Sequence, residues 1–436
     1  MSVEFLTAGS IGLALVYLFA VAVAVVVMAV RRGGRREDPP ADHDAMSESR
    51  FTIPVSLIVP VGGGADDADV DRTIDALLAL NYPQLEVIVI ADGPSASEPL
   101  NAGWWLEARE LFYRAALPTA PVRMMYRSAR DSRLLVVHKT PGTVADALNC
   151  GVNLARFRYV VVVEPGVTFD ADALLRAVTS PLRDPAAVVG ATSHIEITGT
   201  TLQRLRSIRS LMHSRVMWRS SGPALGPCDA VVVWRRDAVA QSGGFSSNAA
   251  DPHLDLMVRL QTSATPGTRG LVVRTTEIFG QRRARSMVDH VRRTARWQAA
   301  ALQAVASLVA AGPNTRVMLG HFFVAEVLTP CAQAWAILAT VAGAAAGYWP
   351  WVDVVFAVVL LALGQAIVTC AALLLRGSVS HAPDARGLQR LLLLAPLEGF
   401  GIAAAAACAR AAGFCVFVFS PRSRRAVDER TPSPAA

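Results

Sequence analysis

The sequence contains few cysteines, few charged residues and only one lysine. Its six cysteines include no C-x-x-C pair. The common zinc and dithiol motifs are therefore excluded. We expect the cysteines to be small core residues of a protein in a reducing compartment. Charged residues make up 18% of the 436 positions and hydrophobic residues 53%, a balance too apolar for a wholly soluble protein.

The 42 basic residues are all arginines except Lys139, and the net charge is +7. Nucleic-acid binding is one reading of that charge. However, the arginine clusters lie beside apolar segments, where an anionic lipid surface explains them equally well. We therefore expect the lipid bilayer as a partner and no nucleic acid.

An uncharged apolar run over residues 10–30 is long enough to cross roughly 30 Å of hydrocarbon. A cleaved signal peptide is the alternative, but here the basic residues follow the run instead of preceding it. The four arginines within residues 31–36 place the N-terminus outside and the rest of the chain in the cytoplasm. We expect a transmembrane anchor over residues 1–30, a flexible linker over 31–50, and a multi-pass plasma-membrane (inner-membrane) protein with a cytoplasmic main domain.

Short β-branched runs alternate with amphipathic stretches over residues 51–285, which predicts β-α-β units and a mostly parallel sheet. In such a sheet, ligands bind beyond the carboxyl ends of the strands. The residues that close the predicted strands are therefore candidate site residues: Pro60 to Gly64, Asp92 and Gly93, and Glu164 to Gly166.

The remainder of the chain is predicted to be helical and membrane-associated. Residues 286–313 form a basic amphipathic region typical of a membrane interface, as do residues 202–219, for which a surface helix on the sheet is the alternative. We expect residues 314–420 to form two membrane spans plus a third span or re-entrant segment, and residues 421–436 to be a disordered tail. Glu326 and Glu398 lie in these apolar segments, where acidic residues are functional candidates.

Seven segments occur in the order in which one known family has them: VSLIVPV, NYPQLEVIVIADG, ALNCGV, VVVEPGVTFDADAL, WRRDAVAQSGGF, DLMVRL and RTARW. On these segments the chain resembles the membrane-bound family 2 glycosyltransferases, the group that includes the poly-N-acetylglucosamine, hyaluronan and cellulose synthases. The resemblance implies a nucleotide-sugar-binding α/β domain of the glycosyltransferase A type, flanked by transmembrane helices. It also implies inverting transfer from a UDP-sugar, with Mg2+ or Mn2+ on the diphosphate and a carboxylate as base.

The resemblance assigns binding roles to the residues that match the family's motifs. An ordinary turn residue is the alternative reading for Asp92, and membrane-interface anchoring is the alternative for Arg296 and Trp297. The nucleotide-sugar residues are Pro60, Val61, Asp92, Asn149 and Glu164, the last also as metal ligand, and the acceptor and diphosphate residues are Arg293, Arg296 and Trp297.

The phosphate and metal motifs depart from the family's pattern. Thr143 and Val144 stand where the family has a glycine and a lysine that help to neutralise phosphate, a task for which Lys139 is the nearby substitute. Gly166 stands where the second aspartate of the D-x-D motif supplies the decisive metal ligand, which leaves Glu164 as the carboxylate of that turn.

The base motif departs as well, and Arg293 replaces the glutamine of the acceptor motif. His253 falls at the position of the family's catalytic aspartate, with Asp251 and Asp255 beside it, and a neutral imidazole is a credible base. A helix start, with Asp251 as the cap residue, is the alternative and is compatible with a catalytic role.

The departures touch several catalytic tasks while the framework segments persist. We therefore expect an integral membrane protein of cell-surface polysaccharide or glycolipid biosynthesis that is catalytically impaired. It would act as partner or regulator of an active synthase or of other polysaccharide-export subunits. The alternative is an active inverting glycosyltransferase that uses a UDP-sugar with an altered metal site and base.

Overall fold

The computed structural model describes residues 3–33, 52–62, 66–92, 106–109, 113, 115–186, 188–198, 231–262, 271–283, 287–310, 316–348, 350–359, 389 and 402–419. The chain divides into two compact units. An α/β unit comprises Asp38–Glu196 and Pro223–Arg283, and a helical unit comprises Met1–Glu37, Ile197–Gly222 and Ala284–Ala436. The predicted linker beyond residue 33, the predicted helix over 202–219, Glu398 and the predicted tail lie outside the described residues.

The strands of the α/β unit form one sheet, in the order β3-β4-β5-β2-β1-β6-β9-β8-β10-β7. The four central strands β5, β2, β1 and β6 are parallel, as the sequence predicts. Strand pairs toward both edges, such as β4 with β5 and β6 with β9, are antiparallel, so the sheet as a whole is mixed. The strands are β1 Val55–Gly62, β2 Leu85–Asp92, β3 Leu106–Ala108, β4 Val122–Ser128, β5 Leu134–Lys139, β6 Tyr159–Val163, β7 Val167–Phe169, β8 Val188–Thr198, β9 Val231–Arg235 and β10 Leu271–Arg283.

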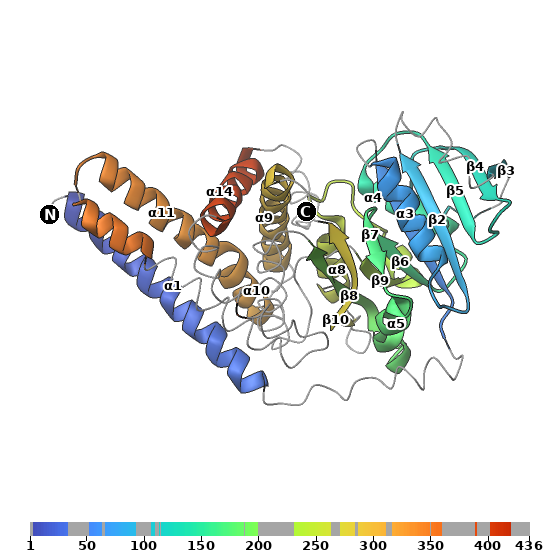
Figure 1. Ribbon diagram of the computed structural model, residues 1–436, viewed down its shortest axis with the longest axis horizontal. Coiled ribbons are helices and arrows are strands. Elements are labelled where there is room, and N and C mark those ends of the chain that lie inside the picture. The colour runs from blue at the N-terminus through green and yellow to red at the C-terminus, as the bar shows by residue number, and fades with distance from the viewer. Residues whose placement is uncertain are drawn as a thin grey trace, which may run out of the picture. The chain divides into compact units, whose positions relative to one another are not determined.

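Helices cover the sheet, and their first turns follow from capping residues. Helix α3 begins after Asp66, whose side chain accepts a hydrogen bond from the amide of Ala68 at 3.2 Å. Helix α4 begins after Thr143, whose hydroxyl accepts from the amide of Asp146 at 3.2 Å. The helices of this unit are α3 Asp67–Leu78, α4 Val144–Leu154, α5 Ala173–Arg183, α7 Arg236–Gln241 and α8 Pro252–Thr262 (Figure 1).

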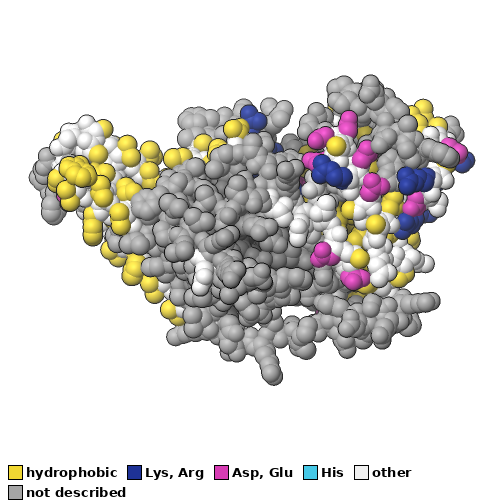
Figure 2. Space-filling model, in the orientation of Figure 1, with side chains coloured by type: hydrophobic (Ala, Val, Ile, Leu, Met, Phe, Trp, Pro, Cys, Tyr) yellow, Lys and Arg dark blue, Asp and Glu magenta, His cyan; other side chains and the backbone are white. Residues whose placement is uncertain are grey.

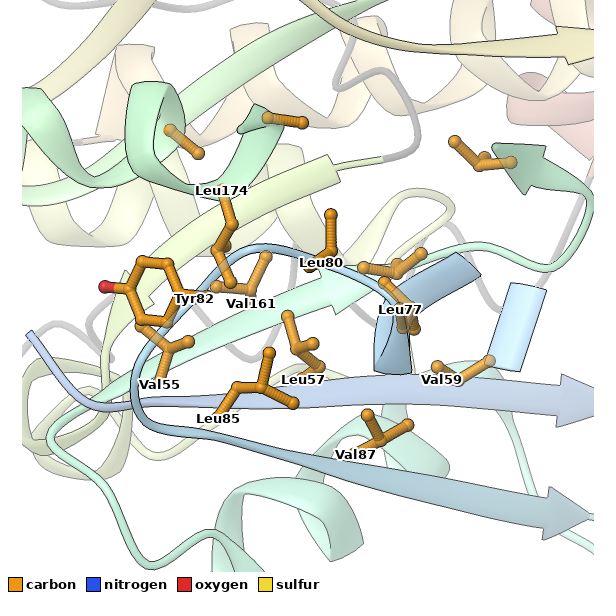
Figure 3. Packing of buried hydrophobic residues seen from close by; sticks show 14 of the residues in the cluster. Val55, Leu57, Val59, Leu77, Leu80, Tyr82, Leu85, Val87, Val161 and Leu174 are labelled. Carbon is orange, nitrogen blue, oxygen red and sulfur yellow. The ribbon is translucent and has the colours of Figure 1, made fainter. Parts of the chain in front are cut away.

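One hydrophobic cluster lies between a face of the sheet and helix α3. Alternate residues of β1, namely Val55, Leu57 and Val59, share that face because side chains of a strand alternate between its two sides. Figure 3 shows these three with Leu77 of helix α3 and Leu80, which lies just after the helix. Burial of this cluster fixes where the strand ends lie, and with them the candidate site.

The helical unit contains α1 Val3–Gly33, α9 Met287–Ala310, α10 Arg316–Phe323, the π-helical turn η4 Val324–Leu328, α11 Thr329–Ala345 and α14 Ile402–Phe419. Residues 351–359 are also helical. Helix α1 packs along α11, where the hydroxyls of Tyr17 and Thr329 lie 3.1 Å apart. By length and hydropathy, one helical stretch among the described residues could cross a membrane, Glu326–Ala345, and the apolar stretch of α1, Gly9–Val23, is shorter.

Candidate functional site

The carboxyl ends of the central parallel strands bring several of the predicted site residues together. Pro60 and Val61 lie near the end of strand β1, where they pair with Ile90 and Ala91 of β2, and Asp92 ends β2. The pairing of β1 with β6 stops at Ile58. Pro60, which has no N–H to donate, therefore lies beyond the part of β1 that is paired on both sides.

Asp92 belongs to a buried charge cluster with Lys139. The lysine ammonium lies 3.3 Å from one carboxylate oxygen of Asp92, and it also pairs with Asp146 and donates to the carbonyl of Thr140. The lysine side chain is fully buried. The same oxygen of Asp92 accepts the amide of Gly142 at 2.8 Å. The Lys139 ammonium is thus paired with two carboxylates of the protein, and its predicted role in neutralising phosphate stays a prediction.

Asn149 lies in helix α4 and is also engaged by the protein. Its side-chain amide donates to the carbonyl of Phe245 at 3.0 Å, and its side-chain oxygen accepts the amide of Phe245 at 2.8 Å. These two bonds fasten the loop after α7 to the helix. Asn149 is buried. Its role is therefore to position the loop around Phe245, next to the candidate site.

Glu164 follows strand β6 and forms an ion pair with a residue 118 positions further along the chain. Its carboxylate oxygen lies 2.6 Å from a terminal nitrogen of Arg282, with 51% of the Glu164 side chain exposed and 11% of the Arg282 side chain. Arg282 lies opposite Val167 in the pairing of β10 with β7. The carboxylate predicted to hold a metal therefore has a guanidinium as its neighbour.

The backbone conformation at position 166 favours glycine. Its φ is +87°, a region that L side chains rarely adopt, and a Cβ there would lie 3.3 Å from the carboxylate of Asp69. The amide of Gly166 donates to the hydroxyl of Thr73 at 2.9 Å. The turn between β6 and β7 is thereby anchored to α3 in a shape that disfavours an aspartate at this position.

The structure places His253 in the first turn of helix α8, in an aromatic pocket. The indole N–H of Trp234 donates to Nδ1 of His253 at 3.4 Å, and the two rings are nearly parallel. The ring of Phe245 lies edge-on, 5.3 Å away between centroids. Burial lowers the pKa of His253, and the carboxylates of Asp251 and Glu164 oppose that shift. His253, Asp251 and Glu164 therefore share one electrostatic neighbourhood.

The two aspartates around His253 have distinct contacts. Asp251 accepts the backbone amides of His253 at 2.9 Å and Leu254 at 3.0 Å, which is the capping role that the sequence offered as the alternative. Asp255 is buried and pairs with Arg259 at 2.9 Å. Arg259 in turn donates to the carbonyls of Ser242 and Gly244, which ties α8 to the loop that Asn149 holds.

The predicted acceptor residues and Glu326 belong to the helical unit. Glu326 is buried within the π-helical turn, where its carboxylate accepts from the indole N–H of Trp297 at 2.9 Å and lies 3.3 Å from Arg410. Trp297 is therefore held by Glu326. Arg293 and Arg296 are exposed on the same helix, α9.

The side chains described here do not suit a divalent metal ion. Magnesium and manganese prefer several hard oxygen ligands. The turn after β6 offers the carboxylate of Glu164, which is already paired with Arg282, and the carboxylate of Asp92 is paired with Lys139. Across the described part of the chain, no three His, Cys, Asp or Glu side chains lie close enough together to hold a metal ion.

Arg282 and Trp234 of the candidate site were not predicted from the sequence, and neither was Arg410, the partner of Glu326 in the helical unit. Each meets its partner through strand pairing or helix packing, and Arg282 is separated from Glu164 by 118 positions. No local pattern marks such pairs. Only the knowledge that β10 pairs with β7 would have pointed to Arg282.

Comparison with solved structures identifies the fold. The chain is similar to the mannosyltransferase PcManGT from Pyrobaculum calidifontis, in complex with GDP-Man and Mn2+, with a TM-score of 0.59 and 17% identity over 94% of this chain and 99% of that one. A looser likeness, with a TM-score of 0.38 and 13% identity over 63% of this chain and 84% of the other, is to glucosyl-3-phosphoglycerate synthase from Mycobacterium tuberculosis. No family profile and no curated protein matches the sequence. The chain thus has the glycosyltransferase A-type fold that its motifs implied.

Proposed function

We propose that this chain is a membrane-anchored, glycosyltransferase-like protein of cell-surface polysaccharide or glycolipid biosynthesis. It binds a nucleotide through its α/β unit but transfers sugar poorly or not at all. It acts as the partner or regulator of a separate, active synthase or export subunit. The likeness to a mannosyltransferase whose structure contains GDP-Man supports the class of ligand, a sugar nucleotide.

One observation carries the proposal: the polar groups that would perform transfer chemistry are engaged by the protein's own side chains. Glu164 pairs with Arg282, and Asp92 pairs with Lys139. A metal ion bound by either carboxylate would have to compete with the cation that already pairs with it. The chain thus keeps the fold, while the carboxylates that transfer chemistry would need form ion pairs within the protein.

His253 supports the same conclusion through its tautomer. An indole N–H can only donate, so Nδ1 of His253 is the acceptor in the bond from Trp234 and carries no proton. The neutral imidazole then carries its proton on Nε2. A general base must present an unprotonated nitrogen to its substrate, and the unprotonated nitrogen of His253 faces Trp234.

Membrane anchoring is supported by the side chains of α1 and α11. The residues that these two helices bury include small ones, such as Ala14 and Ala336, while large apolar side chains are exposed. Leu13 is 74% exposed and Leu338 is 58% exposed. Figure 2 shows hydrophobic side chains over the visible surface of these helices. Small residues inside and large apolar residues outside is the pattern of membrane helices.

The proposal is tested by measuring UDP release from UDP-sugars, and GDP release from GDP-mannose, with the purified full-length chain. Mg2+ or Mn2+ is added, and Glu164→Ala is compared with Glu107→Ala. Glu107 is a matched control because its side chain is 56% exposed and pairs with Arg109 at 2.8 Å. We expect nucleotide binding without turnover. Metal-dependent turnover that Glu164→Ala abolishes and Glu107→Ala preserves would instead establish an active transferase.

The partner role has a separate test in the organism that makes the chain. Deleting its gene should reduce the surface polymer, and the Glu164→Ala and His253→Ala chains should restore the polymer as the unchanged chain does. Failure of both variants to restore it, at equal protein level, would contradict a non-catalytic role.

A further inference from the structure

We propose that Arg282 is the cation that binds the diphosphate of a nucleotide in this chain, so that binding needs no divalent metal. The inference rests on the proposed function in one respect, that the α/β unit retains nucleotide binding. Beyond that, it assigns the charge that neutralises the phosphates to one residue. Glu164 is then the group that occupies the arginine when no ligand is bound.

The location of Arg282 fits this role. Parallel sheets bind their ligands beyond the carboxyl ends of the strands. Arg282 reaches such an end, since it lies opposite Val167 and contacts Glu164, which directly follows the parallel strand β6. Among the described residues, two further cations lie near these strand ends. The Lys139 ammonium is shared between two buried carboxylates, and Arg72, on helix α3, pairs at 2.6 Å with Asp69, whose carboxylate lies beside Gly166.

The chemistry of the contact fits as well. A guanidinium recognises carboxylate and phosphate with the same planar set of N–H donors. At 2.6 Å from a terminal nitrogen of Arg282, the Glu164 oxygen lies where a phosphate oxygen would lie. Because half of the Glu164 side chain is exposed, the carboxylate can be displaced by a ligand from solution.

Electrostatics distinguish this site from one that holds a metal. In a metal site, Glu164 would attract the ion, and removing its charge would weaken nucleotide binding. In the site proposed here, Glu164 competes with phosphate for Arg282, and removing its charge should strengthen binding. The two arrangements therefore predict opposite effects for the same substitution.

The experiment measures the binding of UDP and of GDP to the full-length chain in detergent by calorimetry, in EDTA and then with Mn2+. We expect binding in EDTA, weakened at least about tenfold by Arg282→Gln and partly restored in Arg282→Lys. Glu164→Gln should tighten binding by about two- to fivefold, the range of a half-exposed ion pair.

Matched controls come from the opposite end of strand β6. Arg235 lies opposite Tyr159, its side chain is 17% exposed, and it pairs at 2.8 Å with Asp237, whose side chain is 50% exposed. Arg235→Gln and Asp237→Asn should leave nucleotide affinity unchanged. A similar loss of affinity in Arg235→Gln would show that removing any paired arginine disturbs the unit, and would overturn the specific role of Arg282.

The outcomes separate this inference from the proposed function. Binding that appears only with Mn2+, and that Glu164→Gln weakens, overturns the role of Arg282 while nucleotide binding stands. Absence of binding in both EDTA and Mn2+ overturns the inference together with the nucleotide-binding part of the proposed function. Because Glu164 is half exposed, its substitution is informative even if Arg282→Gln does not fold.

Discussion

At the scale of single residues, the burial of the chain's only lysine governs one end of the sheet. An ammonium group is expensive to bury unless it is paired and hydrogen-bonded. Lys139 meets this condition through Asp92, Asp146 and the carbonyl of Thr140. The cluster joins the ends of β2 and β5 to the first turn of α4, so its charges hold the strand ends in place.

Replacing Lys139 by methionine should therefore destabilise this region strongly. The substitution leaves two carboxylates that are 9% and 13% exposed without their cation. Breaking a buried pair in this way costs about 3–5 kcal/mol. Hydrogen exchange of the β5 and α4 amides in the full-length chain measures the effect, and we expect protection to fall roughly a hundredfold or more.

Two comparison variants make this prediction specific. Arg109→Met removes an arginine whose pair with Glu107 is more than half exposed on both sides, and should change protection little because surface pairs contribute about 0–1 kcal/mol. Lys139→Met combined with Asp146→Asn should recover part of the loss. Equal effects of Lys139→Met and Arg109→Met would contradict the importance of burial.

The candidate site was predictable from sequence where the interaction is local. Asp251 caps a helix that begins at the next residue, and the pattern Asp-Pro-His contains that information. The partner of Glu164 was not predictable, because Arg282 is brought to it by strand pairing. The pairing of Lys139 with Asp92 was predictable only in part. The sequence places both residues at strand ends, but the register that sets them side by side depends on the tertiary structure.

At the scale of elements, the hydrophobic patterns predicted the central strands and helices better than the edges of the sheet. Strands β1, β2, β5 and β6 are buried runs of branched residues that occur between helices or connections long enough to keep them parallel. Strand β9 pairs antiparallel with β6 and β8, and β10 pairs antiparallel with β7, and no local pattern in these strands indicates their direction. For this reason a mostly parallel sheet was predicted where a mixed sheet is observed.

Helix packing in the helical unit depends on a close approach at Gly413. A Cβ added there would lie 2.3 Å from the carbonyl oxygen of Ala295 in α9 and 2.8 Å from Cβ of Gln298. Gly320 is also helical, but a Cβ there would have nothing within 4 Å. The two glycines thus differ in packing while sharing their secondary structure.

Alanine at these two positions should have effects of opposite sign. Gly320→Ala should stabilise by up to about 1 kcal/mol because alanine favours the helix. Gly413→Ala should destabilise by about 1–3 kcal/mol because α14 must move away from α9. Thermal unfolding of the detergent-solubilised chain checks this: the Gly413→Ala midpoint should fall and the Gly320→Ala midpoint should hold or rise. A rise in both would show that α9 and α14 do not pack this closely.

At the scale of the whole molecule, the two units bury their side chains in opposite ways. The α/β unit places its large apolar residues inside, as in the cluster around Leu57 and Val161. In the helical unit, α1 and α11 expose such residues, among them Phe19, Trp335 and Val341. An exposed apolar surface of this kind marks a face that another apolar phase covers, and hydrocarbon of a bilayer is the phase that the proposed function requires.

Substitutions that charge this surface should accordingly impair membrane insertion. Leu338 is 58% exposed on α11, within the stretch Glu326–Ala345, and arginine in the middle of a membrane helix costs about 2.5–3.5 kcal/mol. Met124 is 46% exposed on β4 of the α/β unit and serves as the control. After washing membranes with alkaline carbonate, the unchanged chain and Met124→Arg should remain in the pellet, whereas Leu338→Arg should be partly released or degraded. If carbonate released all three chains equally, the helices would not span the bilayer, and the outward apolar side chains would instead have to be covered by protein.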